Sequence, residues 1–236
     1  MVLEKYRFFI DKCSVLFLID LMKKQIVPPP WKLNGRGYIF VYKFNKNFIQ
    51  NNGFVNTGSK LEFAGGFGFV MIVEYKNSDA GPYDELLFIP GKTKIQNNTN
   101  YSITKIYVST QVSVDSGREN WGIPKEMAHF SFENLHQKRE IIRVGREKEI
   151  FFEADVSHSN FYFPITTRLL PIVLQQFYNH QLYFTQFKGS GRATFAKIHQ
   201  INIIPNFFPP VGKALFGLYV DPFELEFPVP TIKNLQ

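Results

Sequence analysis

The sequence predicts a mainly β fold with antiparallel sheets that are closed or curled on each other. Of its 236 residues, 17% are aromatic, including 26 Phe and 11 Tyr, and aromatic side chains favour strands over helices. Runs of strand-forming residues recur at short spacing with turn signals between them, a pattern typical of β sandwiches and barrels. With 44% hydrophobic residues, a chain of this length can bury a full core.

The first predicted element is a helix over residues 3–25, within an N-terminal segment 1–27. Its apolar residues follow a broad helical pattern, two lysines end it, and three prolines at 28–30 stop it. The apolar face could dock on the β domain, bind a sister subunit or lie on a lipid surface. Acidic residues interrupt the apolar run, which is shorter than the roughly 20 residues of a membrane span, so no span is expected.

Strand signals follow the prolines in sequence order. They occur at 37–44, 66–75, 85–89, 102–112, 127–132, 139–144, 149–156, 181–204 and 223–229. Only residues 166–180 and 213–218 look helical after the N-terminal segment. Because no internal repeat and no long linker divides the remainder, residues 28–236 are predicted to form a single β domain.

Composition excludes several functional classes. The net charge of +7 is dispersed, and the densest basic run, at 138–148, alternates with apolar residues as a solvated strand face does, so nucleic acid is rejected as the main partner. A single cysteine, Cys13, allows no internal disulfide and suggests a reducing, cytoplasmic location. The five histidines have no paired-ligand spacing and no nucleotide-binding glycine motif is present, so no metal or external cofactor is expected.

Lys125 is the residue most difficult to explain as ordinary surface. In RENWGIPKEMAHF, at 118–130, it follows a proline and lies among apolar residues that include Trp121. Burying an ammonium is unfavourable unless it is paired or loses its proton, and a neutral lysine amine is a nucleophile. The alternative is a structural lysine whose stem packs on Trp121 while its amine reaches water or Glu126.

Three stretches carry a family resemblance. SGRENWGIPKEMAHFSF (116–132), WKLNGRGYIFVYK (31–43) and SDAGPYDE (78–85) resemble, in order and approximate spacing, segments of the acetoacetate decarboxylase family. The resemblance covers most of the chain from about residue 28 onward, becoming fainter in the C-terminal half. It implies a closed, cone-like antiparallel β barrel with a few peripheral helices.

The resemblance also implies site residues. Lys125 matches the lysine that forms a Schiff base with a β-keto acid, Arg36 matches an arginine facing the same cavity, and Glu85 matches an active-site glutamate. We therefore expect these three side chains to meet in one cavity, with Trp121 and Val70 on its wall. Arg36 could instead form a fold-locking ion pair with Glu85.

Two positions depart from the family pattern. Glu126 stands where the family has a second lysine, and Val70 stands where it has a further glutamate. Glu126 cannot supply the neighbouring cation that helps to activate such a lysine, so desolvation would have to act alone. Val70 keeps one wall apolar, which favours a hydrophobic ligand over a small diacid.

The leading hypothesis is a lyase that acts on a keto acid through a lysine Schiff base, by decarboxylation or by aldol-type cleavage or dehydration. In this hypothesis Arg36 orients the substrate carboxylate, and Glu85 holds Arg36 or moves a proton. The alternative is a non-catalytic barrel that binds an apolar, acidic ligand with Arg36 as its polar anchor. A structural subunit of a homo-oligomer is the third possibility.

Overall fold

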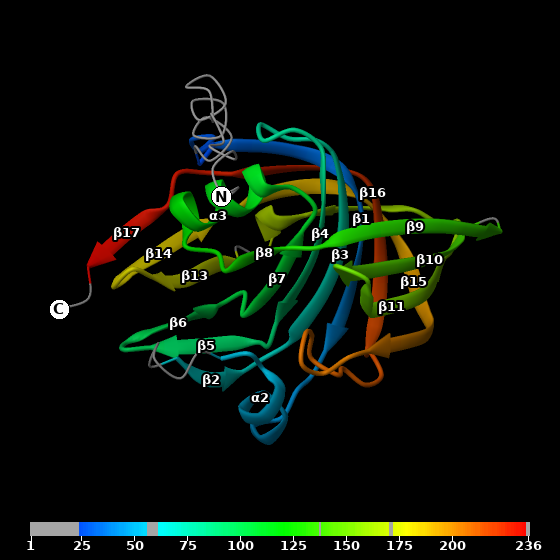
Figure 1. Cartoon of the computed structure of the whole chain (residues 1–236), viewed down its shortest axis with the longest axis horizontal. Coiled ribbons are helices and arrows are strands. Elements are labelled where there is room, and N and C mark those ends of the chain that lie inside the picture. The colour runs from blue at the N-terminus through cyan, green and yellow to red at the C-terminus, as the bar shows by residue number, and fades with distance from the viewer. Residues whose placement is uncertain (1–23, 56–60, 137, 170–171, 235–236) are drawn as a thin grey trace, which may run out of the picture.

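The structure is a computed structural model that describes residues 24–55, 61–136, 138–169 and 172–234. Most of the predicted N-terminal helix lies outside these residues, and residues 24–27, which are described, have no helical structure. The described part is mainly β (Figure 1). None of its helices is long and apolar enough to cross a membrane.

Two sheets contain all the strands of the described residues. The larger, 11-stranded sheet has the order β8 (Lys125–Met127), β7 (Lys105–Val108), β4 (Tyr83–Ile89), β3 (Gly68–Asn77), β1 (Trp31–Tyr42), β16 (Phe216–Phe227), β15 (Lys188–Ile203), β11 (Glu149–His158), β10 (Arg139–Arg146) and β9 (His129–His136), with β12 (Phe163–Thr166) paired to β15. The 6-stranded sheet has the order β17 (Thr231–Asn234), β14 (Gln181–Gln186), β13 (Val173–Tyr178), β6 (Asn98–Tyr101), β5 (Lys92–Ile95) and β2 (Glu62–Gly65). Pairing is antiparallel except for β7 with β8 and β6 with β13.

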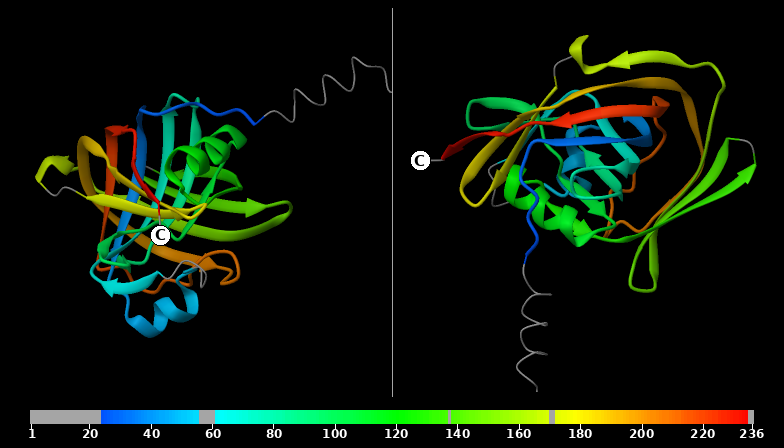
Figure 2. Two further views of the ribbon diagram at one scale, coloured as in Figure 1. Left: turned by 90° about the vertical axis from the view of Figure 1, so that its left-hand side faces the viewer. Right: turned by 90° about the horizontal axis from the view of Figure 1, so that it is seen from above.

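The larger sheet curls around an interior, as the view from above shows (Figure 2). Its two edge strands, β8 and β9, are separated in the chain by Ala128 alone, yet they do not pair with each other. The closed barrel implied by the resemblance is therefore not confirmed, because the sheet is open between these two strands.

Both faces of the larger sheet are buried along its strands β1, β3 and β4, because each face contributes there to a separate hydrophobic cluster. Alternate residues of β1 show this: Tyr38 and Phe40 belong to the interior cluster, whereas Trp31 and Leu33 belong to the outer one. The outer cluster also includes Trp121 of helix α3 (Gln111–Trp121). The strand alternation therefore assigns the buried side chains of β1 to one or the other of these two clusters.

The helices differ from those expected from the sequence. Residues 166–180 contain the 3-10 turn η2 (Thr167–Leu169) and strand β13 rather than a helix, and β16 begins within 213–218. The described helices are instead α2 (Lys46–Asn52) and α3. Thr110 caps the start of α3 by accepting from the Ser113 N–H at 3.4 Å, and Gly122 ends it in the left-handed conformation with φ 65°.

Tyr42 provides a test of the interior packing. It is 2% exposed, and its hydroxyl has no hydrogen-bond partner among the described residues. We expect Tyr42→Phe to leave the free energy of unfolding unchanged or raise it by about 1 kcal/mol, because an unpaired buried hydroxyl is unfavourable. Chemical denaturation measures this change.

The matched control is Tyr38→Phe, on the same face of β1. The Tyr38 hydroxyl donates to Glu140 at 2.9 Å, so its removal is expected to lower stability. If both variants lower the free energy of unfolding by the same amount, the difference between the unpaired hydroxyl of Tyr42 and the paired hydroxyl of Tyr38 is contradicted.

Candidate active site

Lys125 is buried on the outer face of the larger sheet. It begins β8, pairs with Ile106 of β7, and is 4% exposed. Its Nζ lies 3.0 Å from Glu85 Oε2, 3.0 Å from Ser113 Oγ and 3.4 Å from the Tyr83 hydroxyl. Because an ammonium has three N–H donors, these three oxygens can accept all of them.

Glu85 is held from its other side by a tyrosine. It lies on β4, is 4% exposed, and its Oε1 accepts from the Tyr75 hydroxyl at 3.1 Å. Burial, followed by the charge of Glu85, raises the pKa of both Tyr75 and Tyr83 well above the ordinary value. Both phenols therefore stay protonated and can donate to the carboxylate or to its neighbours.

Aromatic rings and a glycine enclose the lysine side chain. Nζ lies 4.9 Å from the centre of the Tyr83 ring and 5.9 Å from that of Trp31. Trp121 lies behind Trp31, with the two ring centres 5.0 Å apart, so Trp31 is the tryptophan over the amine. A Cβ added at Gly117 would lie 2.6 Å from Lys125 Cδ, so only glycine leaves room for the stem in this position.

Glu126 points away from the amine. Successive residues of a strand face opposite sides, and Glu126 instead forms ion pairs with Lys105 at 2.5 Å and Arg146 at 3.0 Å. The departure from the family pattern at this position therefore does not place a second carboxylate beside Lys125.

Arg36 lies on the opposite face of the sheet from Lys125 and Glu85. It pairs across the sheet with Glu74, whereas Val73, the neighbour of Glu74, pairs with Glu85. Strand alternation thus separates the two groups. The structure brings Lys125 and Glu85 together as expected, but it does not bring Arg36 to them, and Val70 lies on the Arg36 face.

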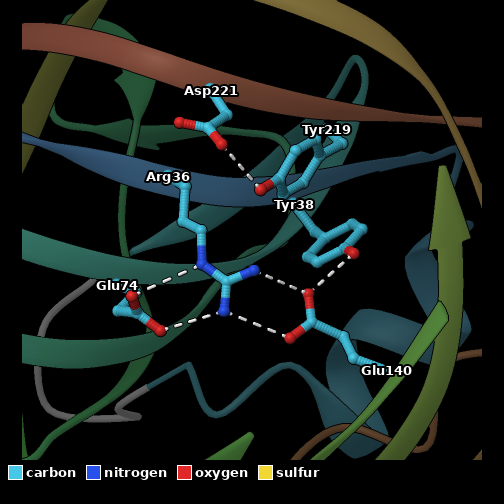
Figure 3. Close-up of polar contacts among 6 residues, drawn as sticks. All are labelled: Arg36, Tyr38, Glu74, Glu140, Tyr219 and Asp221. Atoms are coloured by element: carbon cyan, nitrogen blue, oxygen red, sulfur yellow. Dashed lines mark hydrogen bonds and ion pairs between the residues drawn. The ribbon is translucent and has the colours of Figure 1, made fainter. Parts of the chain in front are cut away.

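The guanidinium of Arg36 is occupied by two carboxylates (Figure 3). It donates to both oxygens of Glu74, at 3.4 and 3.1 Å, and to both oxygens of Glu140, at 3.0 and 3.2 Å. Burial opposes the charge of Arg36, but hydrogen bonds to Glu74 and Tyr219 and the charge of Glu140 outweigh it and raise its pKa. The alternative of an ion pair between Arg36 and Glu85 is therefore wrong in its partner, because Arg36 pairs with Glu74 and Glu140.

Tyrosines complete this interior cluster. Tyr38 donates to Glu140, and Tyr219 donates to Asp221 at 3.0 Å (Figure 3). Burial raises the pKa of Tyr219 to about 12, although the nearby guanidinium opposes the shift. All these groups are paired, so the cluster has the features of a fold-locking network rather than of an open anchor for a substrate carboxylate.

Sequence reasoning missed the carboxylate partners of Arg36 and, beside Lys125, the serine Ser113. Glu74 could have been noticed as a lone charge in the apolar run 66–75, and Ser113 as a polar residue four positions before Gly117 on one helix face. Within the described ranges, no three His, Cys, Asp or Glu side chains gather as a metal site requires.

The chain matches one known protein family by sequence. The model of the acetoacetate decarboxylase family matches residues 21–183. No curated protein matches the chain by sequence.

Several solved structures resemble this fold over most of the chain. Acetoacetate decarboxylase from Legionella pneumophila is 14% identical, with 89% of each chain covered and a TM-score of 0.64. An acetoacetate decarboxylase-like enzyme from Sphingomonas wittichii is 11% identical, with 90% of this chain and 96% of that chain covered and a TM-score of 0.65. The enduracididine biosynthesis enzyme MppR, complexed with pyruvate, is 13% identical over 89% and 92%, with a TM-score of 0.55. The family model matches more than half of the residues of this chain, and the chain therefore belongs to the acetoacetate decarboxylase family.

Proposed function

We propose that the chain is a lyase that forms a Schiff base between the Lys125 amine and the ketone of a small keto acid. The observation that carries the proposal is the buried contact between Lys125 and Glu85, at 3.0 Å. A carboxylate at this distance is within reach to accept a proton from the ammonium and leave a neutral, nucleophilic amine. Pyruvate, a keto acid, is bound by the structurally similar enzyme MppR.

The chemistry follows from these two side chains. The amine attacks the ketone carbon to give a carbinolamine, the acid form of Glu85 returns its proton to the oxygen, and water leaves to form the iminium. In a β-keto acid, the bond to the carboxylate carbon then breaks, CO₂ departs, and the electron pair enters the iminium to give an enamine. Protonation and hydrolysis of the enamine release the product and regenerate the lysine.

Arg36 has a supporting role in this proposal. Its position on the other face of the sheet and its two carboxylate partners favour stabilisation of the curled sheet over contact with the substrate. The substrate carboxylate is then left to other groups around Lys125, such as the hydroxyl of Tyr83.

Reductive trapping tests the proposal. We expect wild-type protein incubated with pyruvate or a β-keto acid and borohydride to gain one covalent adduct, because hydride reduces the iminium to a stable secondary amine. Intact-mass analysis and peptide mapping should place the adduct on Lys125, and Lys125→Ala should abolish it.

Lys105→Ala is the matched control, because Lys105 is another half-buried lysine paired with a glutamate. Its adduct yield should equal that of wild type. If no keto acid gives an adduct while an apolar carboxylate binds measurably, the Schiff-base proposal fails and the second candidate, a non-catalytic carrier, takes its place.

A further inference from the structure

We infer that Ser113 is a positioning residue for the amine of Lys125, an inference that rests on the proposed function. Ser113 is fully buried, at 0% exposure, on the first turn of α3. Its hydroxyl is at 3.0 Å from Nζ, closer than the Tyr83 hydroxyl at 3.4 Å. It is therefore the nearest neutral partner of the amine.

One face of α3 holds the whole lysine side chain. Ser113 and Gly117 are four residues apart, so they lie on the same face of the helix. Gly117 allows the stem to lie against the helix, since a Cβ there would be 2.6 Å from Cδ and 2.9 Å from Cε. The glycine thus brings Nζ to the serine hydroxyl, and the two residues act as one support.

The arrangement fixes the direction of the lone pair. While the ammonium is charged, Glu85, Ser113 and Tyr83 accept its three protons. When Glu85 removes its proton, the two remaining N–H groups stay with Ser113 and Tyr83. The new lone pair then points toward the Glu85 side, so a ketone attacked from there lies beside the acid that protonates its oxygen.

Ser113 also affects when the amine becomes neutral. A hydrogen bond to a charged group stabilises the charged form, so its loss favours deprotonation. A serine with only a packing role would not have this effect. The pH dependence of trapping therefore separates positioning from packing.

The experiment compares wild type, Ser113→Ala and Ser116→Ala. Ser116 is the matched control because it is equally buried on the same helix but its hydroxyl accepts from the Val27 N–H at 3.0 Å. Adduct formation with pyruvate and cyanoborohydride is followed between about pH 6 and 10, a range in which lysine amines lose protons. Circular dichroism checks that each variant is folded.

For Ser113→Ala we expect the half-maximal pH of trapping to fall by about one unit and the plateau rate to fall about tenfold, because the ammonium loses a partner and the amine its orientation. Ser116→Ala should match wild type in both. A Ser113→Ala profile that matches wild type in midpoint and plateau overturns the inference.

A second measurement needs no reaction and so separates this inference from the proposed function. In protein labelled with ¹⁵N-lysine, the buried ammonium should give a resolved ¹H–¹⁵Nζ signal that Lys125→Ala removes. We expect Ser113→Ala to shift or broaden it and Ser116→Ala to leave it unchanged. If wild type forms no adduct but this result holds, the proposed function fails and the positioning role stands. An absent wild-type signal, or one unchanged in Ser113→Ala, overturns the positioning role.

Discussion

Arg36→Ala is expected to lower the free energy of unfolding by about 3 to 5 kcal/mol, the range for breaking a buried ion pair. The variant leaves the Glu140 side chain, which is 4% exposed, without its guanidinium partner. Tyr38 alone then donates to that carboxylate, and one neutral hydrogen bond does not replace a bidentate cation. Urea denaturation at neutral pH measures the loss.

Arg143→Ala is the control for this prediction. Arg143 also binds two carboxylates, those of Glu133 and Glu153, but the side chains in this group are 28 to 54% exposed. Its loss should change stability by less than about 1 kcal/mol, as for other solvent-exposed pairs. If the two variants lose the same small amount, the interior network of Arg36 does not lock the fold, and a substrate-binding role for Arg36 regains support.

Glu85→Gln should have a comparable effect on stability, about 3 kcal/mol or more, and should also abolish adduct formation. The variant keeps the shape of the side chain but leaves the ammonium of Lys125, which has a 5% exposed side chain, without a countercharge. It also removes the acid that protonates the carbinolamine oxygen before water leaves, so the iminium does not form. Denaturation and reductive trapping measure the two effects separately.

The double variant Glu85→Gln/Lys125→Met distinguishes a charge effect from simple misfit. With the cation also gone, no uncompensated charge remains, so at least half of the stability lost in Glu85→Gln should return. Additive losses would show that the two side chains act independently and would contradict the ion pair. Trapping should remain absent in the double variant, because it has no Lys125 amine.

The β character of the fold could be predicted because it depends on local signals. The recurrent aromatic runs correspond to strands such as β1, β3 and β11, since aromatic residues and turn signals act over a few residues. The open edge between β8 and β9 could not be predicted in this way. β8 and β9 follow each other in the chain but lie at the two edges of the sheet. Whether these two edges close on each other depends on the curl of the whole sheet, which no single stretch encodes.

The placement of the candidate site residues was predicted only in part, and strand alternation explains which part. Motif matching identified Lys125 and Glu85, which are in contact. It could not show that Arg36 faces the other way, because both faces of this sheet are buried and the usual alternation of apolar and polar residues gives no guide. Only the register between β1, β3 and β4 reveals the separation.

Helix α3 was missed for a reason connected with the site. Its sequence, QVSVDSGRENW, lacks a continuous apolar stripe, because several of its buried positions are Ser113, Ser116 and Gly117. These small residues face a lysine side chain and the chain segment around Val27 rather than a hydrophobic surface. The apolar periodicity that predicts a helix is absent where the buried face of the helix packs against a polar side chain.

The alternation along β8 limits how this protein can change its length. Lys125 and Glu126 are adjacent, yet one faces Glu85 and the other faces Lys105 and Arg146. An insertion or deletion of one residue just before β8 would turn the strand over and exchange the two charges. A carboxylate would then face Glu85, and an amine would face Lys105 and Arg146, so like charges would meet on both sides of the strand. A change in the length of the chain at this three-residue strand is therefore expected to disrupt both groups of charges at once.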